Sequence, residues 1–138
     1  MPHDSVVHPL SGLLVVPLEP VPFTARIEYR RDDPFAVRLH FGPEHTLDGA
    51  PIVWTFARRL LADGLSLPVG DGDVGVRPHG AARTAVELRT PDGYALLVLR
   101  TRELEAFLDA SERVVPTGSE GRLIAWDDEL AALVRGAC

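Results

Sequence analysis

Lysine, asparagine and glutamine are absent from this sequence of 138 residues, so all 14 basic residues are arginines. Without lysine the chain has no Schiff-base chemistry, no P-loop phosphate site and no lysine general base. We attribute the bias to a GC-rich genome rather than to selection at each position. The absence therefore restricts the possible chemistry and also hints at the source.

Cysteine is nearly absent as well, because Cys138 is the only one. An intrachain disulfide and a cysteine metal cluster are thus excluded, and a reducing compartment is the simplest setting. No window reaches the roughly 18 apolar residues that a membrane helix needs. The moderately apolar segment from Leu10 to Leu18 is broken by Pro17 and is a poor secretory signal. We expect a cytoplasmic protein without direct membrane insertion.

The composition is sufficient for one domain with a real core, since 46% of the residues are hydrophobic. The formal net charge of −6 disfavours a protein that wraps phosphate backbones. Residues 1–12 are short, polar and proline-bearing at their start, which predicts a loose tail. Residues 13–138 are expected to form a single domain.

Alternation of apolar and polar residues predicts strands, and a 3.6-residue period predicts helices. In the strand that follows Pro34, we expect Phe35, Val37 and Leu39 on the buried face. The continuous apolar run 94–99 predicts a central strand covered on both faces. Strands are expected near residues 13–16, 23–29, 35–41, 52–54, 74–77, 84–90 and 94–99, and helices near 55–63, 102–114 and 127–134. Gly64 would end the first helix at its C′ position. This order predicts an α+β fold with a mainly antiparallel sheet and about three helices.

Motifs that could indicate catalysis or cofactor binding are present, but the elements predicted around them are not those that the motifs require. Gly70 to Gly75 has the spacing of a dinucleotide loop, but a strand and Pro78 follow where a helix is required. Gly118 to Gly121 falls short of a nucleophile elbow and lies between two predicted helices. The five histidines are scattered without ligand spacing. We therefore expect no enzyme activity, no catalytic residue, no cofactor and no metal.

Three features are candidates for a contact surface. The first is the polar face of the strands, which bears Arg26, Glu28, Arg38, His40, Glu87 and Arg89; a solvated face with cross-strand charge pairs is its simpler interpretation. The second is Arg58 with Arg59, expected on the exposed side of the first helix, where arginine is a favoured interface residue. The third is Trp126, a large aromatic that either packs in the core or forms an interface. We take Arg58, Arg59 and Trp126 as candidate partner or oligomer contacts.

Several short phrases, in this order along the chain, are similar to those of a known family. They are Asp33 to Val37, Trp54 to Arg58 with Leu60, Leu61 and Gly64, Gly72 to Val74 with Val76 and Pro78, Pro91 to Gly93 with Ala95 to Leu97, Leu104 with Phe107 and Leu108, Val115 and Pro116 with Gly118 and Glu120, and Asp127 with Glu129 and Leu130. Together they resemble the SsgA-like family of sporulation and cell-division proteins of actinomycetes, from about Leu13 to Arg135. The lack of long tails favours an SsgB-like member.

The resemblance implies a non-enzymatic regulator of sporulation-specific division. It implies a role in positioning the FtsZ division machinery at septa through protein–protein contacts, with another SsgA-like protein as a possible further partner. The implied fold is a compact, antiparallel, β-barrel-like core similar to the whirly nucleic-acid-binding proteins, assembled as a homotrimer and recruited to division septa. The alternative function is a single-stranded nucleic-acid-binding module. We disfavour nucleic acid because such binding needs a basic groove with stacking aromatics.

Overall fold

The computed structural model describes residues 4–15, 20–42, 51–91 and 93–121 of the chain. Its elements in chain order are β1 (Ser5–Val15), β2 (Val21–Arg30), β3 (Asp33–Phe41), β4 (Ile52–Ala57), α1 (Arg58–Gly64), β5 (Val69–Asp71), β6 (Val74–His79), β7 (Arg83–Thr90), β8 (Gly93–Arg100) and α2 (Thr101–Val114). No helix within these ranges is long and apolar enough to span a membrane.

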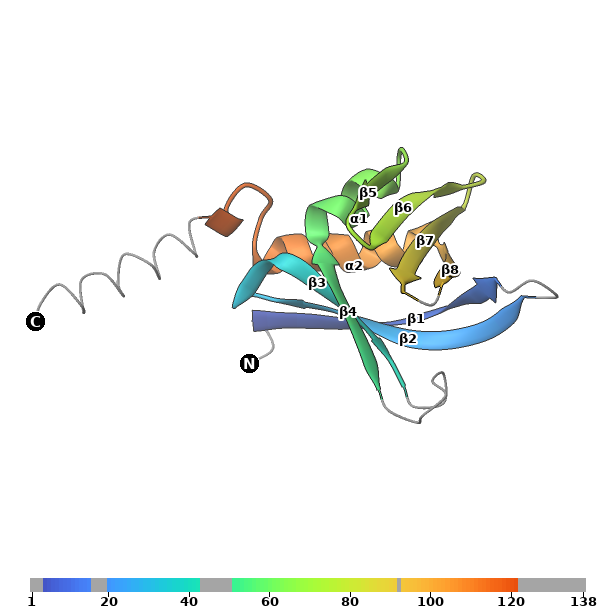
Figure 1. Ribbon diagram of the computed structural model, residues 1–138. Coiled ribbons are helices and arrows are strands. Elements are labelled where there is room, and N and C mark those ends of the chain that lie inside the picture. Colours follow the sequence, from blue (N-terminus) through green and yellow to red (C-terminus); the bar gives the residue numbers. More distant parts are fainter. Residues whose placement is uncertain (1–3, 16–19, 43–50, 92, 122–138) are drawn as a thin grey trace, which may run out of the picture.

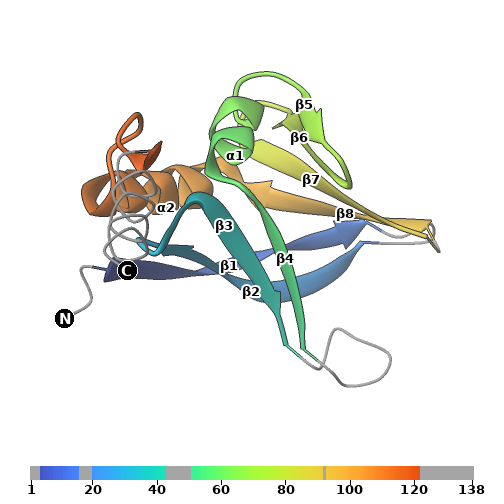
Figure 2. The same cartoon turned by 60° about the vertical axis from the view of Figure 1, so that its left-hand side comes forward.

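All eight strands belong to one antiparallel sheet in the order β4-β3-β2-β1-β8-β7-β6-β5. Strand β1 pairs with both β2 and β8 and so joins the two halves of the sheet. The sheet curls into a half-barrel, with α1 and α2 gathered at one end of it (Figures 1 and 2). The predicted α+β class with an antiparallel sheet is confirmed. The described ranges contain two helices, and the third expected helix, at 127–134, lies outside them.

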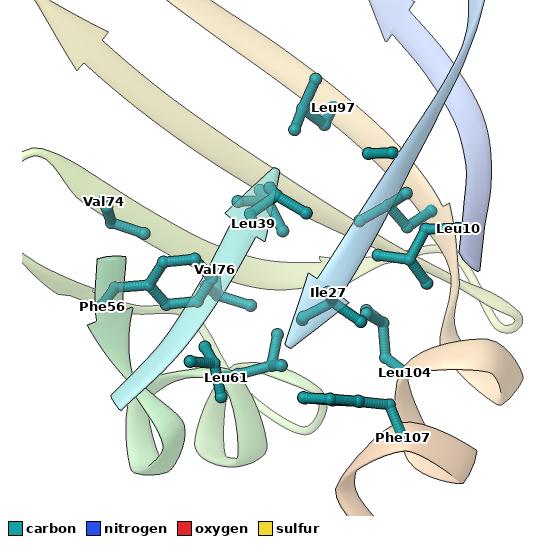
Figure 3. Close-up of a cluster of buried hydrophobic side chains, with 14 of the residues drawn as sticks. Leu10, Ile27, Leu39, Phe56, Leu61, Val74, Val76, Leu97, Leu104 and Phe107 are labelled. Carbon is teal, nitrogen blue, oxygen red and sulfur yellow. The ribbon is translucent and has the colours of Figure 1, made fainter. Parts of the chain in front are cut away.

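The core fills the concave face of the curled sheet and the space beneath the two helices. Leu104 and Phe107 of α2 have no exposed surface. They meet Leu61 of α1 and Ile27 of β2 in one cluster (Figure 3). Apolar side chains three and four residues apart on α2 thus lie on the face that packs against the sheet. We call the opposite, convex side of the sheet its outer face.

The expectation that residues 1–12 form a loose tail is wrong for the residues of β1. This strand begins at Ser5, which is the register partner of Arg30, and pairs with β2 along its length. Leu10 is 1% exposed, and the His8 ring lies 5.7 Å from that of Phe107. Alternate residues of β1 therefore face the core. This two-residue period is hard to recognise in the sequence, because polar residues and a proline lie among the apolar ones.

The first helix begins later than its apolar stripe suggested, because β4 continues in register with β3 as far as Ala57. Gly64 is the last residue of α1 and does not adopt a positive φ, so the prediction of a C′ glycine is wrong. A Cβ atom at Gly64 would lie 2.3 Å from the Cγ1 atom of Val76. Glycine is required here for close approach of the helix to β6.

Phe35 is a further departure from the predicted alternation, since 49% of it is exposed. The pairing of β2 with β3 shifts register between Tyr29 and Arg30, and this irregularity places the buried residue of that stretch at Pro34. The alternation holds from Val37 onward. Strand β8 is buried on both faces only over Leu97–Leu99, and Tyr94 at its start is 70% exposed.

Candidate functional site

Arg58 is the first residue of α1, and the prediction that it is exposed is wrong. Only 3% of it is exposed. The short helix directs this side chain inward, toward the C-terminal end of α2, whereas its neighbour Arg59 points away from the protein with 89% of the side chain exposed. The sequence places both on one polar side of a helix, but the strand that precedes them ends at Ala57 and sets a different helical phase.

The guanidinium group of Arg58 joins three parts of the chain. Its Nη1 atom donates to the carbonyl oxygen of Val115 at 2.8 Å and to the Ser111 carbonyl and hydroxyl oxygens at 3.2 Å. Its Nη2 atom donates to Glu120 at 2.8 Å, and Glu112 completes the ion pairing at 3.2 Å. A buried guanidinium with several charge-assisted hydrogen bonds and two carboxylates is well compensated. Arg58 therefore fastens the turn after α2 to the start of α1.

Tyr29 forms the other side of this cluster. The Cζ atom of Arg58 lies 4.5 Å from the centroid of the Tyr29 ring, a cation–π arrangement. The buried Tyr29 hydroxyl donates to the carbonyl oxygen of Pro34 at 2.9 Å. Burial raises the pKa of Tyr29 to about 12, against the opposing effect of the Arg58 charge. The Tyr29 hydroxyl thus holds the backbone of Pro34 next to the Arg58 cluster.

Glu120 is the acidic partner most firmly held in the cluster, with 12% of its side chain exposed. Burial acts to raise the pKa of Glu120, but hydrogen bonds from Arg58 and from the backbone N–H groups of Glu120 and Gly118 outweigh it. The pKa of Glu120 is therefore lowered from its ordinary value, and the carboxylate is charged at neutral pH. The cluster is a fixed structural ion-pair network.

Of the other two predicted contact residues, Arg59 is described by the structure and Trp126 is not. Arg59 makes a loose ion pair with Asp63 at 3.6 Å, as its i,i+4 spacing predicts, and its role as a partner or oligomer contact stays a prediction. Trp126 lies outside the described residues. Arg58 is thus committed to contacts within the chain, whereas Arg59 is exposed.

The polar strand face carries the cross-strand charge pairs that its simpler interpretation predicts. His40 Nε2 lies 3.0 Å from the Glu28 carboxylate across β2 and β3, and Arg77 Nη1 lies 3.4 Å from the Glu87 carboxylate across β6 and β7. Two further pairs lie within single strands: Arg89 donates to Glu87 at 2.9 Å in β7, and Arg38 donates to Asp33 at 2.7 Å in β3. These side chains are partly exposed, and such pairs contribute little to stability individually.

An apolar hollow of about 190 Å³ opens on the concave face, away from the helices. Residues from the ends of the hairpins β1–β2, β3–β4 and β7–β8 line it. Ile52, which is one of them, is 42% exposed. We call this feature the mouth; its lining is Leu14, Phe23, Phe41, Ile52, Trp54, Leu88, Thr90, Ala95 and Leu97. Sequence reasoning missed it, because it is assembled from strands that the curl of the sheet brings together.

Catalytic geometry does not emerge from these features. Within the described part of the chain, no group of three histidine, cysteine or acidic side chains is placed to hold a metal ion. The buried Arg58 network is satisfied by its own partners and presents no nucleophile with an adjacent base. The features that other molecules could reach are the apolar mouth and the charged outer face.

A family model described as Streptomyces sporulation and cell division protein, SsgA, matches residues 23–120 of the chain. The protein belongs to the SsgA family. The matched range runs from the core-facing start of β2 to Glu120, so it includes both helices and the whole Arg58 cluster. The resemblance carried by the sequence phrases is thereby confirmed.

Two relatives named SsgB are similar to this protein over most of its length. The sporulation-specific cell division protein SsgB of Frankia casuarinae is 41% identical over 97% of this chain and 94% of its own. That of Streptomyces coelicolor is 40% identical over 83% of each chain. The similarity to SsgB agrees with the expected SsgB-like member.

Two solved structures share the fold. One, from work relating mutations in SsgB to longitudinal cell division during sporulation of Streptomyces coelicolor, superposes with a TM-score of 0.75 at 40% identity, over 86% of this chain and 94% of that one. The SsgA-like protein of Thermobifida fusca gives a TM-score of 0.81 at 36% identity, over 92% and 93%. The fold and a role in sporulation cell division therefore rest on relatives that are similar over nearly their full length.

Proposed function

We propose that this SsgA-family protein is a non-enzymatic regulator that helps to position the FtsZ division machinery at sporulation septa through protein–protein contacts. The observation that carries the proposal is the near full-length similarity to sporulation-specific cell division proteins named SsgB. The apolar lining of the mouth, with Ile52 42% exposed, supports action by contact, since exposed apolar patches are typical of interaction sites.

The proposal extends to assembly and location. The family resemblance supports a homotrimer with a whirly-like architecture that works in the cytoplasm and is recruited to division septa. Another SsgA-like protein is a further proposed partner. Arg59, with 89% of its side chain exposed, is available for such a contact, whereas Arg58 is buried. Light scattering of the purified chain would test the trimer, and a monomeric mass at cellular concentration would contradict it.

The function is tested by deleting the gene in the organism that carries it and imaging labelled FtsZ in sporulating cells. We expect FtsZ rings to be missing or misplaced, and septa to fail or to form at irregular spacing. A plasmid-borne copy of the same chain should restore the rings, and an Arg58→Ala copy serves as a destabilised control. Normal rings and septa in the deletion strain would contradict the proposal.

A further inference from the structure

Arg83 and Arg100 face each other on the outer face of the sheet. They are register partners at the adjoining ends of β7 and β8. Like charges directly opposite in an antiparallel pair destabilise the sheet, because their Cβ atoms are only about 5 Å apart. An anion held between the two guanidinium groups would turn this repulsion into attraction.

The positive charge of the pair is only partly neutralised by the protein. Arg100 Nη1 lies 3.0 Å from the Glu103 carboxylate, and that ion pair is largely exposed on the arginine side. The side chain of Arg83 is exposed and makes no hydrogen bond or ion pair with another residue in the described ranges. Two guanidinium groups therefore stand against one carboxylate, which leaves a local excess of positive charge in a chain whose net charge is −6.

Both arginines line a hollow of about 550 Å³ on the outer face. Ser11 and Thr24, register partners in β1 and β2, add their hydroxyl groups to its lining. Apolar surface from β1, β2 and β8 completes the walls, through Leu13, Pro22 and Val98. The hollow thus presents guanidinium and hydroxyl donors beside an apolar wall.

We propose that this hollow, the arginine groove, binds an acidic segment of a protein partner. A carboxylate would accept hydrogen bonds from Arg83 and Arg100, and an apolar side chain next to it would pack on Leu13 and Pro22. The planar fork of arginine matches the carboxylate in geometry as well as charge. The inference rests on the proposed function in one respect, namely that the chain acts through protein contacts.

Single-stranded nucleic acid fits the arginine groove less well. Such ligands need a basic track along several phosphates and exposed aromatic faces for stacking. The groove has two arginines and one neutralising glutamate, and Phe23, the only aromatic side chain among its described lining residues, is 5% exposed. Charge and shape therefore favour a short acidic peptide.

The test is fluorescence anisotropy with the purified full chain and a labelled peptide in which glutamate alternates with valine and serine. A matched peptide with glutamine in place of every glutamate reports the need for charge. The variant Arg83→Gln/Arg100→Gln removes the groove's charge. The control variant, Arg31→Gln/Arg113→Gln, removes the same amount of charge at two exposed positions elsewhere on the surface. Thermal unfolding verifies that both variants are folded.

We expect the acidic peptide to bind, the glutamine peptide to bind much more weakly, and the groove variant to lose about tenfold in affinity. The control variant should bind as the unaltered chain does. Absence of binding at low salt, or equal losses in the two variants, would overturn the proposal. Tighter binding of oligothymidylate that displaces the peptide would also overturn it. None of these results depends on FtsZ positioning. If the groove does not bind the acidic peptide, the proposed role at septa is still tested separately by the gene deletion.

Discussion

The guanidinium group of Arg58 lies over the ring of Tyr29, with its Cζ atom 4.5 Å from the ring centroid. Through this contact the start of α1 is held against β2, while the same arginine binds the end of α2 and the turn that follows. One buried cation thus connects three elements that are far apart in the sequence. Loss of the Arg58 side chain should therefore destabilise the whole domain.

Replacing Arg58 by alanine should lower the free energy of unfolding by about 3–5 kcal/mol, because Glu120 and two backbone carbonyls would lose their buried partner. Arg59→Ala is the matched control, since it removes a charge that is 89% exposed. The control should change stability by less than about 0.5 kcal/mol. Urea unfolding of both variants measures the difference, and equal effects would contradict the assignment of Arg58 to the interior.

Acid should weaken the Arg58 cluster through Glu120. The pKa of Glu120 is lowered in the folded protein, so its contribution is present above its ordinary pKa of 4.5 and is lost as the pH falls through the lower folded value. Glu120→Gln should therefore be less stable than the unaltered chain at pH 7, with the gap narrowing below pH 4.5. Urea unfolding as a function of pH follows the gap. A constant gap down to acid unfolding would be inconsistent with this linkage.

Ionisation of Tyr29 should be delayed by its burial. Its pKa is raised to about 12, so a folded chain with Tyr94→Phe, in which Tyr29 is the only tyrosine left, should show little tyrosinate absorbance near pH 10. Because the folded pKa is raised, stability from the neutral form is lost as the pH rises above 10.0. Spectrophotometric titration beside circular dichroism checks this. Titration near pH 10 with the fold intact would show that the ring is accessible.

Loss of the Tyr29 hydroxyl has a separate effect. Tyr29→Phe leaves the carbonyl oxygen of Pro34 without its buried donor, which should cost about 1–3 kcal/mol of stability. Tyr94→Phe is the control, because Tyr94 is 70% exposed. Chemical unfolding of the two variants compares them. If the Tyr29 variant were as stable as the Tyr94 variant, the hydrogen bond to Pro34 would have no energetic role.

Gly64 should not tolerate a methyl group. Its Cβ atom would lie 2.3 Å from Val76 Cγ1, so Gly64→Ala must displace α1 from β6 and should destabilise the protein by about 1–3 kcal/mol. Gly75→Ala is the control, because the nearest atom to that Cβ is 3.7 Å away. The melting temperatures of the two variants should differ clearly. A Gly64→Ala protein that melts with the unaltered chain would contradict the close packing.

Local patterns predicted both described helices and at least part of every strand except β5, because alternation and helical stripes report which face of an element is buried. They failed where packing rather than pattern decides. The start of β1 was mistaken for a tail, and Phe35 was placed inside although the register shift after Tyr29 turns it outward. Gly64 was interpreted as a cap, whereas its neighbour Val76 explains it.

The candidate sites were harder to predict for the same reason. The burial of Arg58 depends on Glu120 and Val115, more than fifty residues away, so no local signal distinguishes it from Arg59. The arginine groove and the mouth are assembled by the curl of the sheet from several strands. The family phrases nevertheless included both Arg58 and Glu120, which the structure joins in one ion pair.

The proposed positioning of FtsZ is tested best by two-colour imaging of the chain and FtsZ during sporulation. The fluorescently tagged chain should mark future septal sites before FtsZ arrives, and rings should form only where the chain lies. FtsZ rings that assemble at regular spacing before the chain appears, or at sites that it never occupies, would contradict the claim.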